Sequence, residues 1–228
     1  MKRGDFLWLA ILCAVSSIMI VPSSHQIFVS ATKEHPYIMG FGKFAVLATM
    51  GELLAIRIAM GEWKRPAGVV YRSIIWGLIG ILIVLMFEVF SSGVAGALSK
   101  GLLWSGDTFS AKIWTAFWIG AIMNLAFGPA FMTLHRITDT YIDIICGENV
   151  PLRSVKLSDV ISRIDWHGLV SFVILKTIPY FWIPAHTLTF LLPPEYRVLM
   201  AAYLSVVLGA ILAYGKSKKS KVQQAAIK

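Results

Sequence analysis

Long apolar runs separated by short polar segments form the pattern of this chain. A helix needs about 20 apolar residues to cross the hydrocarbon core of a bilayer, and six runs approach or exceed that length. The pattern predicts an all-α fold, a polytopic transmembrane helical bundle of about six spans in one integral membrane domain, 1–228. The predicted spans are 6–22, 36–60, 69–98, 113–137, 168–192 and 198–214.

The first apolar run is open to two interpretations. It follows Lys2 and Arg3, and residues 29–31 (Val-Ser-Ala) resemble a small-residue cleavage site, as in a signal peptide. Against this, the run is longer than a usual signal core and apolar residues resume after Pro22. We favour a retained helix, and a cleaved signal within residues 1–31 is the alternative.

Two polar segments lie outside the spans. Residues 147–166 carry apolar side chains near helical spacing among charges, which predicts either a short amphipathic helix on the membrane surface or a solvated loop. Residues 215–228 form a basic tail. Either segment is suited to contact headgroups or a soluble partner.

The charge distribution predicts an orientation. The net charge is +9, and the basic residues sit at span ends, so they favour a role in topology over nucleic-acid binding. With six spans, fourteen Lys and Arg residues fall on the side of the termini and four on the other. Both termini are therefore expected on the cytoplasmic side. Because residues 1–31 lack an arginine- and serine-rich transit pattern, we favour a bacterial cytoplasmic membrane over an organelle membrane.

Three polar residues fall deep within the predicted spans. At a rise of about 1.5 Å per residue, Glu52 and Lys176 lie about 12 and 13 Å from the cytoplasmic ends of their helices, and Asn124 lies near the midplane. A lone charge at the centre of a helix costs about 3 kcal/mol. We therefore expect Glu52 and Lys176 to face each other near Asn124, either lining a polar path or forming a buried structural ion pair.

The fifth span contains helix-breaking residues. Pro179 and Pro184 free backbone carbonyls that must be satisfied inside the bundle. His186 follows them and could titrate near neutral pH, so these three residues are candidates for a helix break and a gate. His135 and Asp139, one turn apart at the end of the fourth span, could form a pair.

Small residues recur every four positions in two spans. Such stripes allow close approach of helices, and in lipid this is the ordinary basis of helix association. The two stripes, which predict helix contacts, are Gly120, Asn124 and Gly128 in the fourth span and Ser205, Gly209 and Ala213 in the sixth.

The chain contains none of the motifs that support enzymatic chemistry. It has no nucleophile–base arrangement, phosphate-binding glycine loop or HExxH motif. Cys13 and Cys146 lie in unrelated segments and form no metal or disulfide framework. We therefore expect no enzyme activity, no metal and no cofactor.

Four stretches of the chain form a recognisable set of motifs: His35-Pro36 followed by Gly51-Glu52, Gly128-Pro129 followed by Asp139, Trp182 with Pro184, and Pro193-Pro194-Glu195-Tyr196-Arg197. In order and spacing they resemble the Mpv-seventeen and peroxisomal-membrane-protein family. Thr189, Met132 and Ile56 stand where that family has asparagine, histidine and glutamine, and span 69–98 has no counterpart in its four-helix core. The resemblance implies a channel-like or solute-permeation role.

Two functions from different classes remain. The first is a membrane channel or transporter-like protein for small solutes or ions, with a polar path near the proline-broken fifth span. The alternative is a non-transporting membrane scaffold that interacts with lipid or a protein partner. The expected partners are the lipid bilayer and an unknown small solute, and association with further copies of the same chain in a homo-oligomer is an additional option. Nucleic acid is not expected as a partner.

Overall fold

The computed structural model describes the backbone of residues 2–225 and the side chains of residues 2–211, 213 and 214. Within the described backbone the chain is helical and contains no strand. The all-α prediction is confirmed. The helical segments are α1 (Arg3–Ser17), α2 (Pro22–Glu34), α3 (Pro36–Met60), α4 (Val69–Ser99), α5 (Ala111–Ala126), α6 (Gly128–Ile142), η1 (Asp143–Gly147), η2 (Leu152–Ser154), α7 (Leu157–Arg163), α8 (Trp166–Gly168), η3 (Leu169–Trp182), α9 (Ile183–Leu191) and α10 (Pro194–Ala225).

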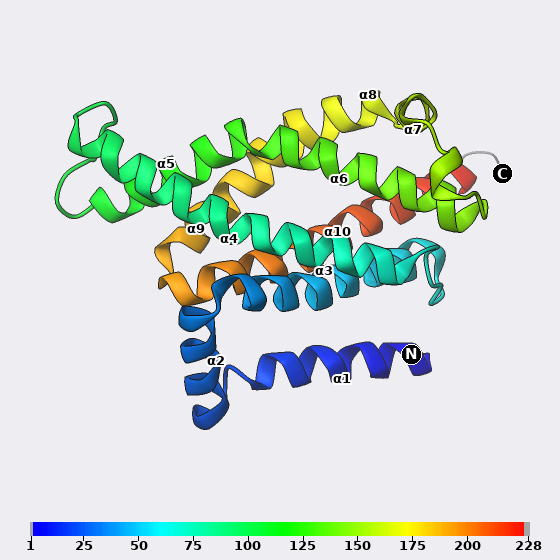
Figure 1. The fold of residues 1–228 in the computed structure, drawn as a ribbon, viewed down its shortest axis with the longest axis horizontal. Helices are drawn as coiled ribbons and strands as arrows, with labels where there is room; N and C mark the ends of the chain where they lie inside the picture. The colour runs from blue at the N-terminus through cyan, green and yellow to red at the C-terminus, as the bar shows by residue number, and fades with distance from the viewer. Residues whose placement is uncertain (1, 226–228) are drawn as a thin grey trace.

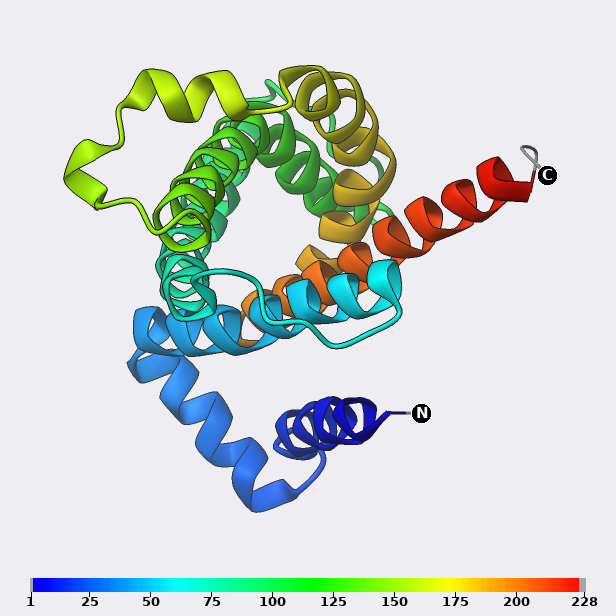
Figure 2. The ribbon, with the colours of Figure 1, turned by 90° about the vertical axis from the view of Figure 1, so that its right-hand side faces the viewer.

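The long helices run side by side along one axis. Figure 1 shows α3, α4 and α10 aligned with this axis, with α5, α6 and the α8–η3–α9 segment beside them. Seen along the axis, α3, α4, α6, η3 and α10 form a ring, and α1 and α2 lie outside it (Figure 2). The ring places one face of each helix towards a common interior.

Four helical segments in residues 2–225 are long and apolar enough to cross a membrane, and up to six if two bent pairs each count as one span. These lengths and compositions indicate an integral membrane protein. The four segments are Pro36–Met60, Val69–Ser99, Trp166–Leu191 and Pro194–Ile211.

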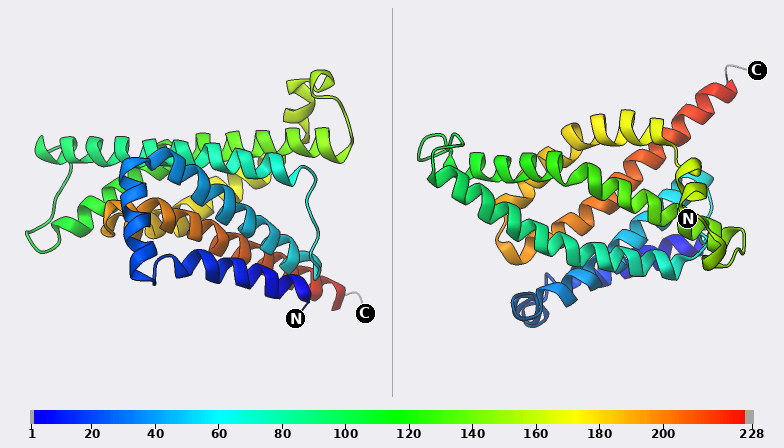
Figure 3. Two further views of the ribbon diagram at one scale, coloured as in Figure 1. Left: turned by 60° about the horizontal axis from the view of Figure 1, so that its bottom comes forward. Right: turned by 45° about the horizontal axis from the view of Figure 1, so that its top comes forward.

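The first predicted span is not one continuous helix. α1 ends at Ser17, and α2 continues after a bend of 78°. In Figure 1 and the left panel of Figure 3, α2 runs nearly at right angles to α1 and α3. Fifteen helical residues extend only about 22 Å, less than the thickness of a hydrocarbon core. α1 is attached to the bundle by the Trp8 indole, which donates to the Met50 carbonyl at 3.0 Å, and by Asp5, which pairs with Arg57 at 2.9 Å.

The fourth predicted span is also bent. α5 and α6 meet at Phe127 and Gly128, and the two-helix segment bends by 48°. Pro129, at the start of α6, lacks the N–H that would continue the α5 hydrogen-bond ladder. The bend therefore has a local cause in the sequence, and it carries α6 towards the end of the bundle that holds the first turn of α1 and the last turns of α10 (Figure 1).

The proline-containing fifth span widens without breaking. η3 contains Pro179 and is wound with i→i+5 hydrogen bonds, as in the bond from the Ile183 N–H to the Ile178 carbonyl. Pro184 lies in the first turn of α9, directly after η3, and it removes a second N–H donor from the same continuous segment. The predicted helix break is therefore a wider turn of backbone within one continuous segment, Trp166–Leu191.

Glycines allow close helix contacts at the predicted stripes. A Cβ on Gly209 of α10 would lie 3.2 Å from the Gly51 carbonyl oxygen of α3, and one on Gly120 of α5 would lie 3.1 Å from the Thr187 nitrogen of α9. Both stripes therefore contact neighbouring helices, as predicted. A further crossing joins α3 to α4, where a Cβ on Gly40 would lie 2.9 Å from the Gly80 carbonyl oxygen.

The polar segment 147–166 contains a short amphipathic helix, α7. Val160 is fully buried, whereas the neighbouring Ile161 is 41% exposed. Glu148 forms an ion pair with Arg163, and the hydrogen bond between them raises the pKa of the Arg163 guanidinium. Of the basic tail, residues 215–228, only the backbone to residue 225 is described, and its side chains lie outside the described residues.

Candidate functional site

A cavity of about 320 Å³ lies in the interior of the helix ring. Its walls come from α3, α4, α5, α6, η3, α9 and α10, so every helix of the ring contributes. On α3 the lining runs from Phe44 to Glu52, about 12 Å at 1.5 Å per residue. Most lining side chains are apolar or aromatic, and the polar groups gather at two levels.

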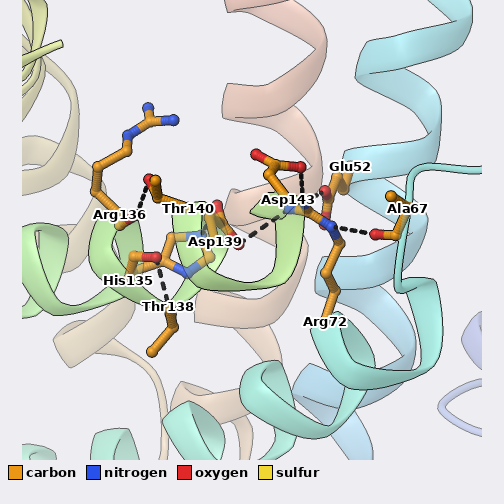
Figure 4. Close-up of polar contacts among 9 residues, drawn as sticks. All are labelled: Glu52, Ala67, Arg72, His135, Arg136, Thr138, Asp139, Thr140 and Asp143. Carbon is orange, nitrogen blue, oxygen red and sulfur yellow. Dashed lines mark hydrogen bonds and ion pairs between the residues drawn. The ribbon is translucent and has the colours of Figure 1, made fainter. Parts of the chain in front are cut away.

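The first polar level is organised by Arg72, in the first turn of α4. Its side chain is only 6% exposed. Nη1 donates to Glu52 Oε1 at 2.9 Å and to Asp139 Oδ1 at 3.1 Å, and Nη2 donates to Asp143 Oδ1 at 2.6 Å (Figure 4). Nε donates to the Ala67 carbonyl at 3.0 Å. We call these four charged residues the Arg72 cluster.

The Arg72 cluster carries more negative than positive charge. One guanidinium binds three carboxylates, which leaves a net charge of −2 when all are ionised. Glu52 and Asp139 line the cavity, whereas the Asp143 side chain is 64% exposed. A guanidinium can serve several carboxylates at once because its donors form a rigid fork. The cluster therefore brings two carboxylates, Glu52 and Asp139, to one end of the cavity.

The predicted ion pair between Glu52 and Lys176 is wrong. Glu52 binds Arg72, and Lys176 is exposed and does not line the cavity. The widened turns of η3 bring Thr177 and Ile178 to the inside instead. In the charge distribution along the sequence, Arg72 is only one of the basic residues counted on the side of the termini. An arginine in the first turn of a long apolar helix was the signal that could have identified it.

His135 lies beside this cluster on α6. Its Nε2 is 3.5 Å from Asp139 Oδ2, so the predicted pair of these residues is confirmed. The ring packs against Trp76, with ring centroids 4.2 Å apart. The His135 Nδ1 atom is buried and has no hydrogen-bond partner within the described residues. Arg136 also lines the cavity, but its guanidinium points away from Glu52 and Asp139 (Figure 4).

The second polar level is a pair of buried side chains, Asn124 and His186. Asn124 Nδ2 donates to the Gly120 carbonyl at 2.7 Å and lies 2.8 Å from His186 Nδ1. Because a carbonyl only accepts, the Asn124 atom at this position must be the amide nitrogen, so His186 Nδ1 is the acceptor. His186 is therefore the neutral tautomer with its proton on Nε2.

An indole completes this level. Trp182 stacks on His186 with ring centroids 5.2 Å apart and an interplanar angle of 19°. Trp182 is 8% exposed, and its Nε1 has no hydrogen-bond partner in the described part of the chain. An indole nitrogen can only donate. The Trp182 Nε1 donor is therefore enclosed by neighbouring atoms without a hydrogen-bond acceptor among the described residues.

The predicted site residues divide into two groups. The first group does not line the cavity and consists of His35, Pro36, Pro129, Lys176, Pro179, Pro184, Pro193 and Arg197. Three of its prolines, Pro36, Pro129 and Pro184, lie in the first turns of helices. Arg197 has a separate role, because its Nε donates to the Leu192 carbonyl at 2.9 Å in the turn before α10. The residues that do line the cavity are Gly51, Glu52, Asn124, Gly128, Asp139, Trp182 and His186.

The described residues contain no group of three or more His, Cys, Asp or Glu side chains that could hold a metal ion. Cys13 and Cys146 are both free thiols. The chemistry that the cavity offers is therefore charge pairing, hydrogen bonding and apolar contact. In comparisons with known proteins, no family model, no curated protein and no solved structure matches the chain.

Proposed function

We propose that this chain is a membrane channel or transporter-like protein for small solutes or ions, and that the interior cavity is part of its path. The observation that carries the proposal is a cavity of about 320 Å³ with polar groups at two levels, inside a bundle of membrane-length helices. Ionisable groups at membrane depth are costly and commonly mark solute or ion pathways. Arg72, Glu52 and Asp139 fit that description.

The shape of the surrounding helices supports a path over a purely structural core. α5 and α6 bend where they meet at the cavity wall, and the widened η3 supplies Val173, Thr177 and Trp182 to it. Transporters commonly form solute sites from irregular or discontinuous helices near the midplane. The path that we propose therefore runs along the inner face of the fifth span, and its charged residues include Glu52 and Asp139 but not Lys176.

The resemblance to the Mpv-seventeen and peroxisomal-membrane-protein family is consistent with this proposal. Residues from three of the four matching stretches, which are far apart in the chain, converge on one cavity: Gly51 and Glu52, Gly128 and Asp139, and Trp182. We propose on this basis that the chain is a divergent relative of that family.

We also propose the orientation with both termini in the cytoplasm of a bacterial cell. The described N-terminal end, the loop after α3 and the segment that contains η2 and α7 share one end of the bundle with the last turns of α10 (Figure 1). The opposite end carries a cluster of Trp104, Trp114 and Trp118. Aromatic clusters of this kind are typical of membrane interfaces.

A non-transporting scaffold is the second candidate, and the surface near α7 favours it. Leu152 and Leu157 are 63% and 54% exposed and lie next to the basic residues Arg153 and Lys156. Exposed apolar side chains with adjacent basic residues suit the headgroup region of an anionic leaflet. In this alternative the cavity would be a packing defect through which no solute passes.

Ionic current across a planar bilayer and tracer uptake into liposomes, both with purified protein, test the proposal. We expect current or uptake with wild-type protein, changed selectivity with Glu52→Gln, and reduced passage with Leu208→Trp, which fills the cavity from α10. Lys176→Ala is the matched control and should behave as wild type, because Lys176 is exposed outside the cavity. Absence of both current and uptake, from protein shown to be folded, would favour the scaffold.

A further inference from the structure

We propose that the second polar level of the cavity binds a neutral molecule with an apolar body and a carboxamide-type group, that is, a hydrogen-bond donor and an acceptor side by side. The site consists of Asn124 Oδ1 and His186 Nε2–H. This inference rests on the proposed function, because it names the class of solute that would occupy the path. It concerns equilibrium binding, however, which is measured whether or not the solute is then moved.

Asn124 and His186 are buried, and each keeps one hydrogen-bonding atom open to the cavity. Both residues line the cavity, and they are only 5% and 8% exposed. Asn124 Nδ2 is engaged by the Gly120 carbonyl and by His186 Nδ1, whereas Asn124 Oδ1 and His186 Nε2 have no hydrogen-bond partner within the described residues. Neither atom belongs to the unpaired side-chain atoms that are fully enclosed, unlike Trp182 Nε1. Their remaining surface therefore faces the cavity.

The two open atoms have opposite hydrogen-bonding character. The oxygen of an asparagine side chain only accepts, and Nε2 of this histidine tautomer donates. The bond of 2.8 Å between Asn124 Nδ2 and His186 Nδ1 holds the two side chains next to each other. A carboxamide that gives its N–H to Asn124 and its carbonyl to His186 satisfies both atoms at once. A ligand with an acceptor alone leaves Asn124 Oδ1 unpaired, which costs free energy in a buried site.

Both side chains are held in place before a ligand arrives. The Gly120 carbonyl fixes the Asn124 amide at 2.7 Å. The His186 ring is stacked on Trp182, with centroids 5.2 Å apart, and meets the edge of Phe87 at 5.7 Å. A donor and an acceptor that are already fixed lose little conformational freedom on binding, and this raises affinity.

The second polar level favours a neutral ligand because the charged residues of the cavity lining lie far from it. Within the described residues these are Glu52, Arg136 and Asp139. At 1.5 Å per residue along α5 and α6, Arg136 and Asp139 lie about 18 and 22 Å beyond Asn124. Glu52 shares the Arg72 Nη1 atom with Asp139 and belongs to the same distant level. A charge held at Asn124 would therefore be buried without a counter-charge.

The neighbouring wall suits an apolar body. Met123 and Phe127 line the cavity within one turn of Asn124 on α5. Met86 lines it from α4, next to the Phe87 ring that contacts His186. Such side chains hold a ring by dispersion. The whole cavity, about 320 Å³, lies at the lower end of the range of about 300–1,000 Å³ for small-molecule pockets, which favours a compact ligand with one ring.

Calorimetric titration of the full chain in lipid nanodiscs tests the proposal with four probes of nearly equal shape. Benzamide carries a donor and an acceptor, and acetophenone has a methyl group in place of the amide nitrogen. Benzoate is the anionic counterpart and benzamidinium is the cationic one. Empty nanodiscs correct for partition into lipid. We expect benzamide to bind about tenfold more tightly than acetophenone, as for one hydrogen bond to a buried group, and more tightly than both ions.

Variants assign the two hydrogen bonds. Asn124→Leu should abolish the difference between benzamide and acetophenone, because the amide N–H then loses its acceptor. His186→Phe keeps an aromatic ring beside Trp182 and should weaken both probes by a similar factor, since both lose the donor to their carbonyl. Glu52→Gln is the control at the charged level and should leave benzamide binding unchanged. A native thermal transition of each variant excludes a folding defect.

Four outcomes would overturn the inference. They are equal affinity for benzamide and acetophenone in the wild type, as expected if water alone occupies the two polar atoms; tighter binding of either ion; no binding of any probe to folded protein; and a benzamide preference that persists in Asn124→Leu. Benzamide binding without current or uptake would support this inference and reject the channel or transporter. Current or uptake without benzamide binding would overturn this inference and support the proposed function.

Discussion

At the scale of single residues, Arg72 is the side chain that allows three carboxylates to lie together. Glu52, Asp139 and Asp143 come from α3, α6 and the turn that follows α6, and each is within 3.1 Å of a guanidinium nitrogen. Without Arg72 the three negative charges would repel one another, two of them in largely buried positions. The same contact thus stabilises the bundle and places charge in the cavity.

Replacement of Arg72 by alanine should therefore destabilise the protein. We expect a loss of about 3 kcal/mol in the free energy of unfolding, the lower end for breaking a buried ion pair because the Asp143 side chain is largely exposed. Unfolding by denaturing detergent from mixed micelles measures the change. Asp143→Asn is the control and should cost less than 1 kcal/mol, in the range of exposed ion pairs. An Arg72→Ala protein as stable as wild type would contradict the assigned role.

The Asn124–His186 hydrogen bond makes a second residue-scale prediction. His186 should be the neutral Nε2–H tautomer, because its Nδ1 accepts a hydrogen bond from Asn124 Nδ2, which also donates to the Gly120 carbonyl. Nitrogen-15 chemical shifts of labelled histidine report the tautomer, and His186→Gln identifies the resonance. Asn124→Leu should release the constraint and cost about 1–3 kcal/mol, since it leaves a buried acceptor unpaired. A proton found on Nδ1 would contradict the hydrogen-bond assignment.

At the scale of helices, the position of the cavity depends on how closely α3 packs against its neighbours. Gly51 contacts α10, and Gly40 and Gly80 meet where α3 crosses α4. Because these positions have no side chain, the helix backbones come close at the edges of α3. Phe44 and Ala48, which lie between Gly40 and Gly51 on α3, line the cavity.

Gly80→Ala should disturb this crossing. Its Cβ would overlap the backbone of Gly40, which cannot move aside as a flexible side chain can, so we expect a loss of about 1–3 kcal/mol in stability. Gly93→Ala on the same helix is the matched control, because a Cβ there meets nothing within 4 Å. The control should be neutral or slightly stabilising, since alanine favours helix more than glycine does. Thermal unfolding of both variants in detergent measures the difference, and equal transitions would refute the close crossing.

At the scale of the whole molecule, the arrangement of the connections predicts which segments share a membrane face. Ser154, the last residue of η2, and Ser105, in the loop between α4 and α5, are both exposed. The segment that leads into α7 and the loop between α4 and α5 lie at opposite ends of the bundle (Figure 1). Single cysteines at these positions, in a background lacking Cys13 and Cys146, should react with a membrane-impermeant maleimide from opposite sides. In intact cells we expect labelling at residue 105 only, and in lysed cells at both.

Labelling of both positions in intact cells would contradict the alternation of the helices across the membrane. Labelling at residue 154 only would agree with the alternation of the helices but would reverse the proposed orientation. The distribution of basic residues predicts that the termini lie inside the cell. Equal expression of the two cysteine variants is the necessary control.

The local pattern of the chain determined the helical class and the approximate position of every long helix. Apolar length and helix propensity depend on neighbours in sequence. α3 and α4 accordingly begin at the predicted residues 36 and 69, and α10 begins at Pro194, four residues before its predicted span. The bend before Pro129 and the irregular turns around Pro179 also have local causes. The convergence of Glu52, Asn124 and His186 on one cavity was partly predictable for the same reason, since polar groups avoid lipid.

The partners of those polar groups were decided only by the tertiary structure. Arg72 is 20 residues from Glu52, 67 from Asp139 and 71 from Asp143 along the chain. Whether they meet depends on the rotation and tilt of three helices, which hydropathy does not encode. The widened η3 also changes which side chains face inward, so Thr177 enters the cavity wall and Lys176 does not. The sequence by itself determined that charge would be buried, and the packing of the helices determined with which partner.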